Sequence, residues 1–216
     1  MDKTTDRRKI RTKRLLRKAL LELMDEKGLD KVTVRDLTER AEVNRGTFYL
    51  HYKDIYDLMD QIKKEIFDGL AAEMSKIVVS DIAKYADKQV PYPPAVHLLQ
   101  YFRKQYDFFR VILGPNGDIA FPYQIRMFMA KQMHNQVLVH IPNDDSALVP
   151  RDYLVAFITS AQLGLLTHWI QSGMSLPEEK VAIIIARIMY KGPIMAAFPE
   201  GLWSEAAPSA PFSYPR

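Results

Sequence analysis

Residues 43–54 read VNRGTFYLHYKD, and this stretch decides what kind of fold the chain adopts. The flanking residues favour helix, yet Gly46 stands near the start and aromatic side chains fall on more than one side. Glycine inside a helix costs roughly 1 kcal/mol relative to alanine, and a helix that only packs against a core needs one apolar stripe. The stretch therefore predicts a helix with a second face that contacts something outside its own core.

Two short helices of similar design are predicted in this region. The first covers residues 33–40, where Thr33 can act as the N-cap and Asp36 completes an approximate capping box. The second covers residues 44–52 and has Asn44 as its N-cap. Because only a tight turn separates them, the pair predicts a helix-turn-helix, whose second helix can enter a DNA major groove.

Helical spacing divides the second helix into two faces. With Phe48 turned inward, Tyr52 lies on the same side, whereas Gly46 and Tyr49 project the other way. Arg45 can read a guanine or bind a phosphate, and Tyr49 is long enough to reach a phosphate. Gly46 would let the backbone approach a partner closely. The alternative is that Tyr49 packs on a neighbouring helix and Arg45 is simply solvated.

The first 18 residues concentrate positive charge, although the net charge of the whole chain is only +4. Asp2 and Asp6 are the only acidic residues among them. Local basicity of this kind supplies phosphate contacts and counterion release; a solvated helix end would look the same. The basic residues are Lys3, Arg7, Arg8, Lys9, Arg11, Lys13, Arg14, Arg17 and Lys18.

The composition narrows the protein class. Hydrophobic residues make up 48% and charged residues 26%, as in an ordinary globular protein. The absence of cysteine excludes disulfides and thiolate metal sites, and suits a reducing cytoplasm. The sequence has no run of about 18 apolar residues and no apolar leader, so we expect neither a transmembrane helix nor export.

The rest of the chain also reads as helix, because no sustained alternation typical of strands occurs. We expect an all-α fold with three parts: a basic three-helix DNA-binding domain (residues 1–55), a larger helical regulatory and dimerisation domain (56–200) and a poorly ordered Pro- and Ser-rich tail (201–216). Its longer helices are predicted at residues 8–27, from 54 into the late seventies, and at 95–113, 122–140, 151–172 and 177–198.

Residues 32–59, VTVRDLTERAEVNRGTFYLHYKDIYDLM, resemble the N-terminal helix-turn-helix of the TetR family of transcriptional regulators. The shared pattern is a Thr-led helix, an Ala-x-Val turn, a Thr-Phe-Tyr core and an aromatic-Lys-Asp exit. The resemblance implies an all-helical homodimer that binds a pseudo-palindromic operator in double-stranded DNA. It also implies dimerisation through the last two long helices, at about residues 151–172 and 177–198.

The same resemblance assigns DNA contacts to individual positions. Ile55 departs from the pattern, because the family often has a phosphate-binding lysine there. Lys53 or the basic N-terminal segment would then have to supply that contact. The DNA-contacting residues that the resemblance implies are Thr33, Arg35, Asn44, Arg45, Gly46, Thr47, Tyr49, His51 and Lys53.

Residues 101–121 and 153–179 resemble, more loosely, a C-terminal domain type of this family that includes regulators of dihydroxyacetone kinase operons. This second resemblance identifies a domain type without naming a ligand. The TetR resemblance as a whole implies an effector pocket in the C-terminal domain, and we expect a repressor released by an effector bound there. The alternative is a regulator of the same fold, or an activator, controlled by a protein partner. In both cases the protein is expected to act in the cytoplasm, without a membrane.

Methionine and aromatic residues crowd the middle helices and could line an adaptable apolar effector pocket, or simply form core. The candidates are Tyr101, Phe102, Tyr106, Phe109, Tyr123, Met127, Met133, Gln162 and Trp169. Gln162 and Trp169 could instead lie at the dimer seam, where Gly164 permits close helix approach. The histidines lack metal-ligand spacing, and no catalytic or nucleotide-binding motif occurs, so we expect no metal, no cofactor and no enzymatic activity.

Overall fold

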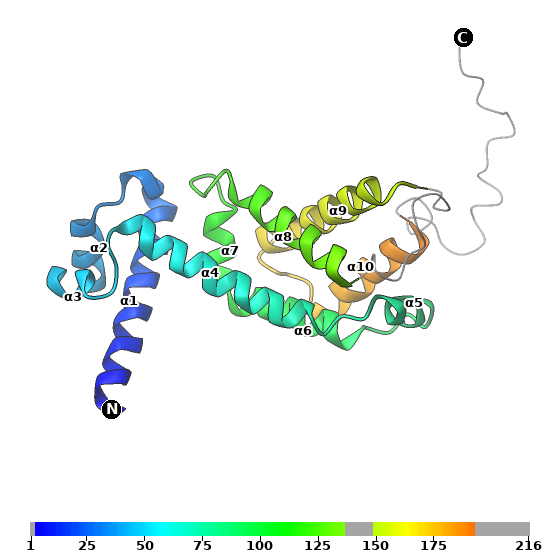
Figure 1. Cartoon of the computed structure of the whole chain (residues 1–216), viewed down its shortest axis with the longest axis horizontal. Coiled ribbons are helices and arrows are strands. Elements are labelled where there is room, and N and C mark those ends of the chain that lie inside the picture. Colours follow the sequence, from blue (N-terminus) through cyan, green and yellow to red (C-terminus); the bar gives the residue numbers. More distant parts are fainter. Residues whose placement is uncertain (1–2, 137–148, 193–216) are drawn as a thin grey trace, which may run out of the picture.

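The computed structural model describes residues 3–136 and 149–192 (Figure 1). Within these ranges the chain is helical throughout and contains no strand, which confirms the all-α prediction. The predicted tail at 201–216, and the predicted helix ends at 140 and 198, lie outside the described residues.

The N-terminal unit consists of α1 (Lys3–Lys27), a 3-10 turn (Leu29–Lys31), α2 (Val34–Ala41) and α3 (Arg45–Tyr49). The expected first helix starts at residue 8, but α1 begins five residues earlier. It ends as predicted before Gly28, whose φ of 81° suits glycine. The apolar stripe of α1 includes Leu16, Leu20 and Met24, which are fully buried.

The caps of α2 and α3 hold the helix-turn-helix together. The Thr33 hydroxyl accepts a hydrogen bond from the Asp36 N–H at 3.1 Å, and the Asp36 carboxylate accepts one from the Thr33 N–H at 3.0 Å. This confirms the predicted capping box. The Asn44 side chain caps α3 as predicted by accepting from the Gly46 N–H at 2.7 Å. The tight turn between the helices passes through Glu42 in the left-handed conformation, with φ of 52°.

The chain continues into α4 (Ile55–Met74), which starts at the Asp54 N-cap, and then α5 (Val79–Asp87). One helix into the late seventies was expected, but α4 ends at Met74 and a separate short helix follows. Gly69 lies where α4 crosses the helix that contains Tyr101, at residues 93–104. A Cβ added there would lie 2.2 Å from the Tyr101 hydroxyl, so this crossing requires a residue without a side chain.

The middle of the body contains α6 (Pro93–Lys104) and α7 (Tyr106–Ile112). The single helix predicted for residues 95–113 is wrong, because the chain breaks at Gln105. After this break both Phe108 and Phe109 are buried. On a helix, neighbouring side chains point about 100° apart, so a helix packed on one face does not bury two neighbours of this kind. The turn at 114–118 requires Gly117, since a Cβ there would lie 2.1 Å from the Ile112 carbonyl oxygen.

The body is completed by α8 (Phe121–Gln136), α9 (Arg151–Gln171) and α10 (Glu178–Lys191). In Figure 1 these helices gather at the end of α4 that is remote from α3. By length and composition α9 could cross a membrane, with a mean hydropathy of 1.3 over its most apolar 18 residues. Only 28% of that window is buried, so much of an apolar helix faces outward.

A single buried cluster extends from α1 to α10 and joins the N-terminal unit to the body. Polar contacts support the junction between α1 and α7. The Arg17 guanidinium donates to the Gln105 side chain at 2.8 Å, and Arg110 pairs with Asp25 at 2.9 Å. The predicted domain boundary at residue 55 coincides with the start of α4, although the core continues across it.

Candidate nucleic-acid interface and effector cavity

The two faces of α3 differ sharply in burial. Phe48 is fully buried and Tyr52, just beyond the helix, is 5% exposed, whereas Tyr49 and Leu50 are 49% and 81% exposed. This confirms the predicted inward orientation of Phe48 and Tyr52. It also excludes the alternative in which Tyr49 and Leu50 pack on a neighbouring helix. The outer face of α3 is therefore available to a partner.

Arg45 and Tyr49 form one unit on that outer face. The Arg45 guanidinium donates to the Tyr49 hydroxyl at 3.2 Å and lies 5.6 Å from the centre of its ring. The Tyr49 ring in turn packs edge-on against Phe48, with 5.3 Å between ring centres. The buried Phe48 thus supports an exposed pair that offers a guanidinium and a phenol to phosphate or base edges.

Gly46 has a second explanation beyond close approach of a partner. A Cβ at this position would lie 3.1 Å from the Asn44 side-chain oxygen that caps the helix. The exposed backbone at Gly46 is thus compatible with both the cap and close contact with DNA. Because the Asn44 oxygen is engaged in the cap, only its amide nitrogen remains to donate to a base.

The remaining predicted DNA contacts lie around α3 and α2. Thr33 and Arg35 are exposed, and Arg35 pairs with Glu39 at 2.8 Å. Thr47 is half-buried, while Lys53 is exposed just after the helix. Thr33 is also part of the capping box. Its hydroxyl therefore has a structural role in addition to any contact that it makes with a DNA phosphate.

His51 follows α3 and lies within electrostatic reach of basic residues on α1. Burial lowers the pKa of His51, and the positive charges of Lys13 and Lys9 lower it further. These lysines and the other basic side chains of α1 from Arg7 to Arg14 are exposed, and Figure 1 shows that half of α1 projecting past α2 and α3. The surface next to α3 is therefore positively charged.

Ile55 is only 5% exposed and packs in the core at the first turn of α4. A buried isoleucine cannot substitute for a phosphate-binding lysine. The nearest exposed lysine in the sequence is Lys53, whose backbone N–H donates to Asp57 at 2.9 Å while its side chain remains accessible.

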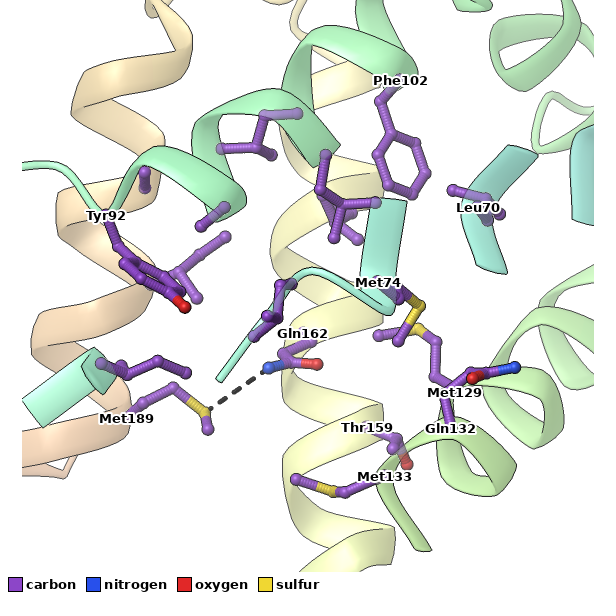
Figure 2. A pocket seen from close by; sticks show the side chains of 18 of the residues that line it. Leu70, Met74, Tyr92, Phe102, Met129, Gln132, Met133, Thr159, Gln162 and Met189 are labelled. Carbon is purple, nitrogen blue, oxygen red and sulfur yellow. Dashed lines mark hydrogen bonds between the residues drawn. The ribbon is translucent and has the colours of Figure 1, made fainter. Parts of the chain in front are cut away.

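A second feature is an apolar cavity of about 150 Å³ at the far end of α4 (Figure 2). Residues from α4, α5, α6, α8, α9 and α10 line it, together with Ile77 and Tyr92. The methionines Met74, Met129, Met133 and Met189 contribute side chains that adapt to different shapes.

Only three of the predicted pocket residues line this cavity: Phe102, Met133 and Gln162. Leu70, Met74 and Tyr92 also line it and were not among the predicted residues. The sequence feature that could have predicted them is a recurrence at helical spacing of Leu70, Met74 and Ile77, at the end of α4 and just beyond it. That stripe alone does not distinguish a cavity wall from core.

The other six candidates lie elsewhere. The Tyr101 hydroxyl donates to the Ile66 carbonyl at 3.3 Å, at the crossing of α4 and α6. The Trp169 indole N–H donates to the Leu176 carbonyl at 2.9 Å, and Arg103 lies over its ring. Of the remaining four, Phe109 is fully buried in the core and Tyr106 is half-buried, while Tyr123 and Met127 are exposed on α8.

Comparisons with known proteins place both parts of the chain in one family. Residues 16–62 match the family model described as bacterial regulatory proteins, tetR family. Residues 89–191 match a model described as a transcriptional regulator C-terminal region of TetR type. Together these matches cover more than half of the chain.

Individual relatives agree with these models. A curated relative is an uncharacterized HTH-type transcriptional regulator, YxbF, from Bacillus subtilis (strain 168), 29% identical over 55 residues. That stretch is 26% of this chain and 14% of the relative, so the chain spans well under two thirds of the relative's length.

Two solved structures share the fold. A TetR transcriptional regulator from Streptococcus agalactiae 2603V superposes with a TM-score of 0.59 at 22% identity, covering 87% of this chain and 97% of that one. The dihydroxyacetone kinase operon activator DhaS superposes with a TM-score of 0.53 at 16% identity, covering 88% and 98%. With the two family models and the helix-turn-helix geometry, these similarities establish that the chain belongs to the TetR family of DNA-binding transcriptional regulators.

Proposed function

We propose that this regulator acts in the cytoplasm as a homodimeric repressor, which binds a pseudo-palindromic operator and leaves it when a small molecule occupies the cavity. The observation that carries the proposal is the position of the cavity. It touches Leu70 and Met74 at the end of α4, and α4 begins directly after the recognition helix. A ligand there contacts the helix that follows α3 in the chain.

The outward face of α9 supports the dimer. Tyr153 and Phe157 are 69% and 59% exposed, and Gly164 lies on the same stripe with nothing within 4 Å of an added Cβ. On α10, Ile184 and Tyr190 are also exposed. Apolar helix faces of this kind pack together in four-helix interfaces, which explains an apolar α9 that a single chain leaves uncovered.

Dimerisation would present two copies of α3 to successive major grooves, about 34–36 Å apart. A ligand shifts an equilibrium only through different affinities for its two states. We therefore expect the ligand to favour a position of α4 in which the two copies of α3 no longer match that spacing.

The test combines selection and titration. Duplexes selected from a random pool with the purified protein should share inverted half-sites, and a gel-shift titration should show strong preference over random competitor. Equal affinity for every duplex would refute the operator proposal. Sedimentation of the wild type and of Phe157→Glu, which places charge in the proposed seam, should show a dimer and a monomer respectively.

A second candidate is control by a protein partner. The cavity of about 150 Å³ is smaller than the roughly 300 Å³ at which drug-sized pockets begin. In addition, Tyr123 and Met127 are exposed one turn apart on α8, and Ile119 is exposed in the turn just before this helix. If Tyr123→Ser with Met127→Ser abolishes regulation in cells but leaves operator binding in vitro unchanged, this candidate replaces the first.

A further inference from the structure

We infer that the cavity selects a small uncharged molecule, with an apolar body about the size of one six-membered ring and a single oxygen that accepts a hydrogen bond from Gln162. The inference names the class of effector and rests on the proposed function only for its regulatory consequence. Binding itself can be measured without DNA.

The chemistry of the cavity wall excludes a charged ligand. Among the described residues that line it there is no carboxylate, amine, guanidinium or imidazole. A carboxylate moved from water into such surroundings would lose its hydration without gaining a partner, which is strongly unfavourable. An organic acid or a phosphorylated metabolite therefore does not fit this wall.

Four polar side chains line the cavity, those of Tyr92, Gln132, Thr159 and Gln162, and two of them are already engaged. The Tyr92 hydroxyl accepts from the Val78 N–H at 2.8 Å and donates to the Val78 carbonyl at 3.3 Å. The Thr159 hydroxyl donates to the Val155 carbonyl one turn earlier at 2.8 Å. Both groups have satisfied their donors within the fold, so neither needs the ligand.

Gln162 differs from them because its partner is poor. Its side-chain amide donates to the Met189 sulfur at 3.6 Å (Figure 2). A thioether is a weak acceptor, whereas a hydroxyl or carbonyl oxygen is a good one. A ligand oxygen that replaces the Met189 sulfur would give this amide a stronger hydrogen bond. Gln162 is therefore the donor that we expect to orient the ligand, and the half-buried amide of Gln132 on α8 lines the same cavity as a second donor.

The volume sets the size of the apolar body. An engineered apolar cavity of about 150 Å³ in another protein binds benzene, and this cavity has the same volume. The four methionines allow local adjustment of this space. A long acyl chain is larger than this volume.

Calorimetric titration of the full chain with matched probes tests the inference. Cyclohexanol should bind at least about tenfold more tightly than cyclohexanecarboxylate at neutral pH. Dodecanol should not compete with cyclohexanol. Equal or tighter binding of the carboxylate, competition by dodecanol, or no heat from cyclohexanol at millimolar concentration would each overturn the inference.

Two variants locate the ligand. Gln162→Leu should weaken cyclohexanol about two- to tenfold, the range of one hydrogen bond, and leave toluene binding unchanged. Ala186→Leu fills the wall next to Met189 and should abolish binding of both. Should Ala186→Leu fail to fold, as judged by circular dichroism, the contrast between cyclohexanol and toluene in Gln162→Leu still decides. Equal weakening of both ligands there would overturn the role of Gln162.

A gel shift in the presence of cyclohexanol separates this inference from the proposed function. Binding of cyclohexanol without release of the operator would overturn the gating mechanism but support the ligand class. An operator that binds normally while the carboxylate outcompetes cyclohexanol would overturn the ligand class and leave DNA binding intact.

Discussion

The N-terminal unit and the helical body solve different problems with the same secondary structure. In the unit, caps and a tight turn within some twenty residues hold α2 and α3, and the side chains proposed to contact DNA point outward from a small core. In the body, six helices far apart in sequence line a cavity, and the side chains proposed to hold an effector point inward. The proposed site depends on local geometry in the first region and on the packing of distant segments in the second.

The largest expected effect tests whether the core under α3 supports its outer face. Phe48→Ala should destabilise the protein by about 3–5 kcal/mol, because a fully buried ring leaves a cavity. Leu50→Ala, two residues away and 81% exposed, is the matched control and should change stability by less than about 0.5 kcal/mol. Urea unfolding measures both, and similar losses would contradict the assigned orientation of α3.

The next test concerns the packing of α4 in the body. Gly69→Ala should cost about 1–3 kcal/mol, because the new Cβ overlaps the Tyr101 ring. Tyr101→Ala removes that ring, so adding Gly69→Ala to it should cost much less than Gly69→Ala alone. A double-mutant cycle by thermal unfolding measures this coupling. Additive effects would show that the two residues do not meet.

DNA affinity tests the outer face of the N-terminal unit directly. Arg45→Ala and Tyr49→Ala should each weaken operator binding by about 1–3 kcal/mol, or about 5- to 150-fold. The dimer should remain intact in sedimentation. Lys88→Ala removes an exposed lysine at the end of α5, far from α3 in the molecule (Figure 1), and serves as the control for net charge. Unchanged affinity in both α3 variants would place the interface elsewhere.

The smallest effect concerns the capping box. Hydrogen bonds from Lys27 and Thr33 hold the pKa of Asp36 well below its ordinary value. A carboxyl whose pKa is lower in the folded than in the unfolded protein stabilises the fold fully above the unfolded pKa, which is about 3.9 for Asp. This stabilisation is lost as the pH falls through the folded pKa. Wild type should exceed Asp36→Asn in stability at about pH 6, and the difference should shrink below about pH 4. If the stability difference between wild type and Asp36→Asn did not change with pH, it would have a cause other than the charge of Asp36.

The two regions also differ in how much their sequences predict. The caps at Thr33 and Asn44 and the inward Phe48 follow from neighbours within a few residues, so they were predictable. The break at Gln105 was not, because neither glycine nor proline marks it and the side chain is instead held by Arg17, 88 positions away. The cavity wall likewise depends on which helices meet, and most of its predicted residues lie elsewhere in the body.

The continuous core has a consequence for how the molecule comes apart. The helix α1 packs on α7, and the buried cluster runs through both regions. The N-terminal unit is therefore not an independent domain joined to the body by a flexible linker. We expect one cooperative melting transition and no protease-resistant fragment ending near residue 55. Core substitutions in the body would then lower occupancy of the operator through unfolding, even when they touch neither DNA nor ligand.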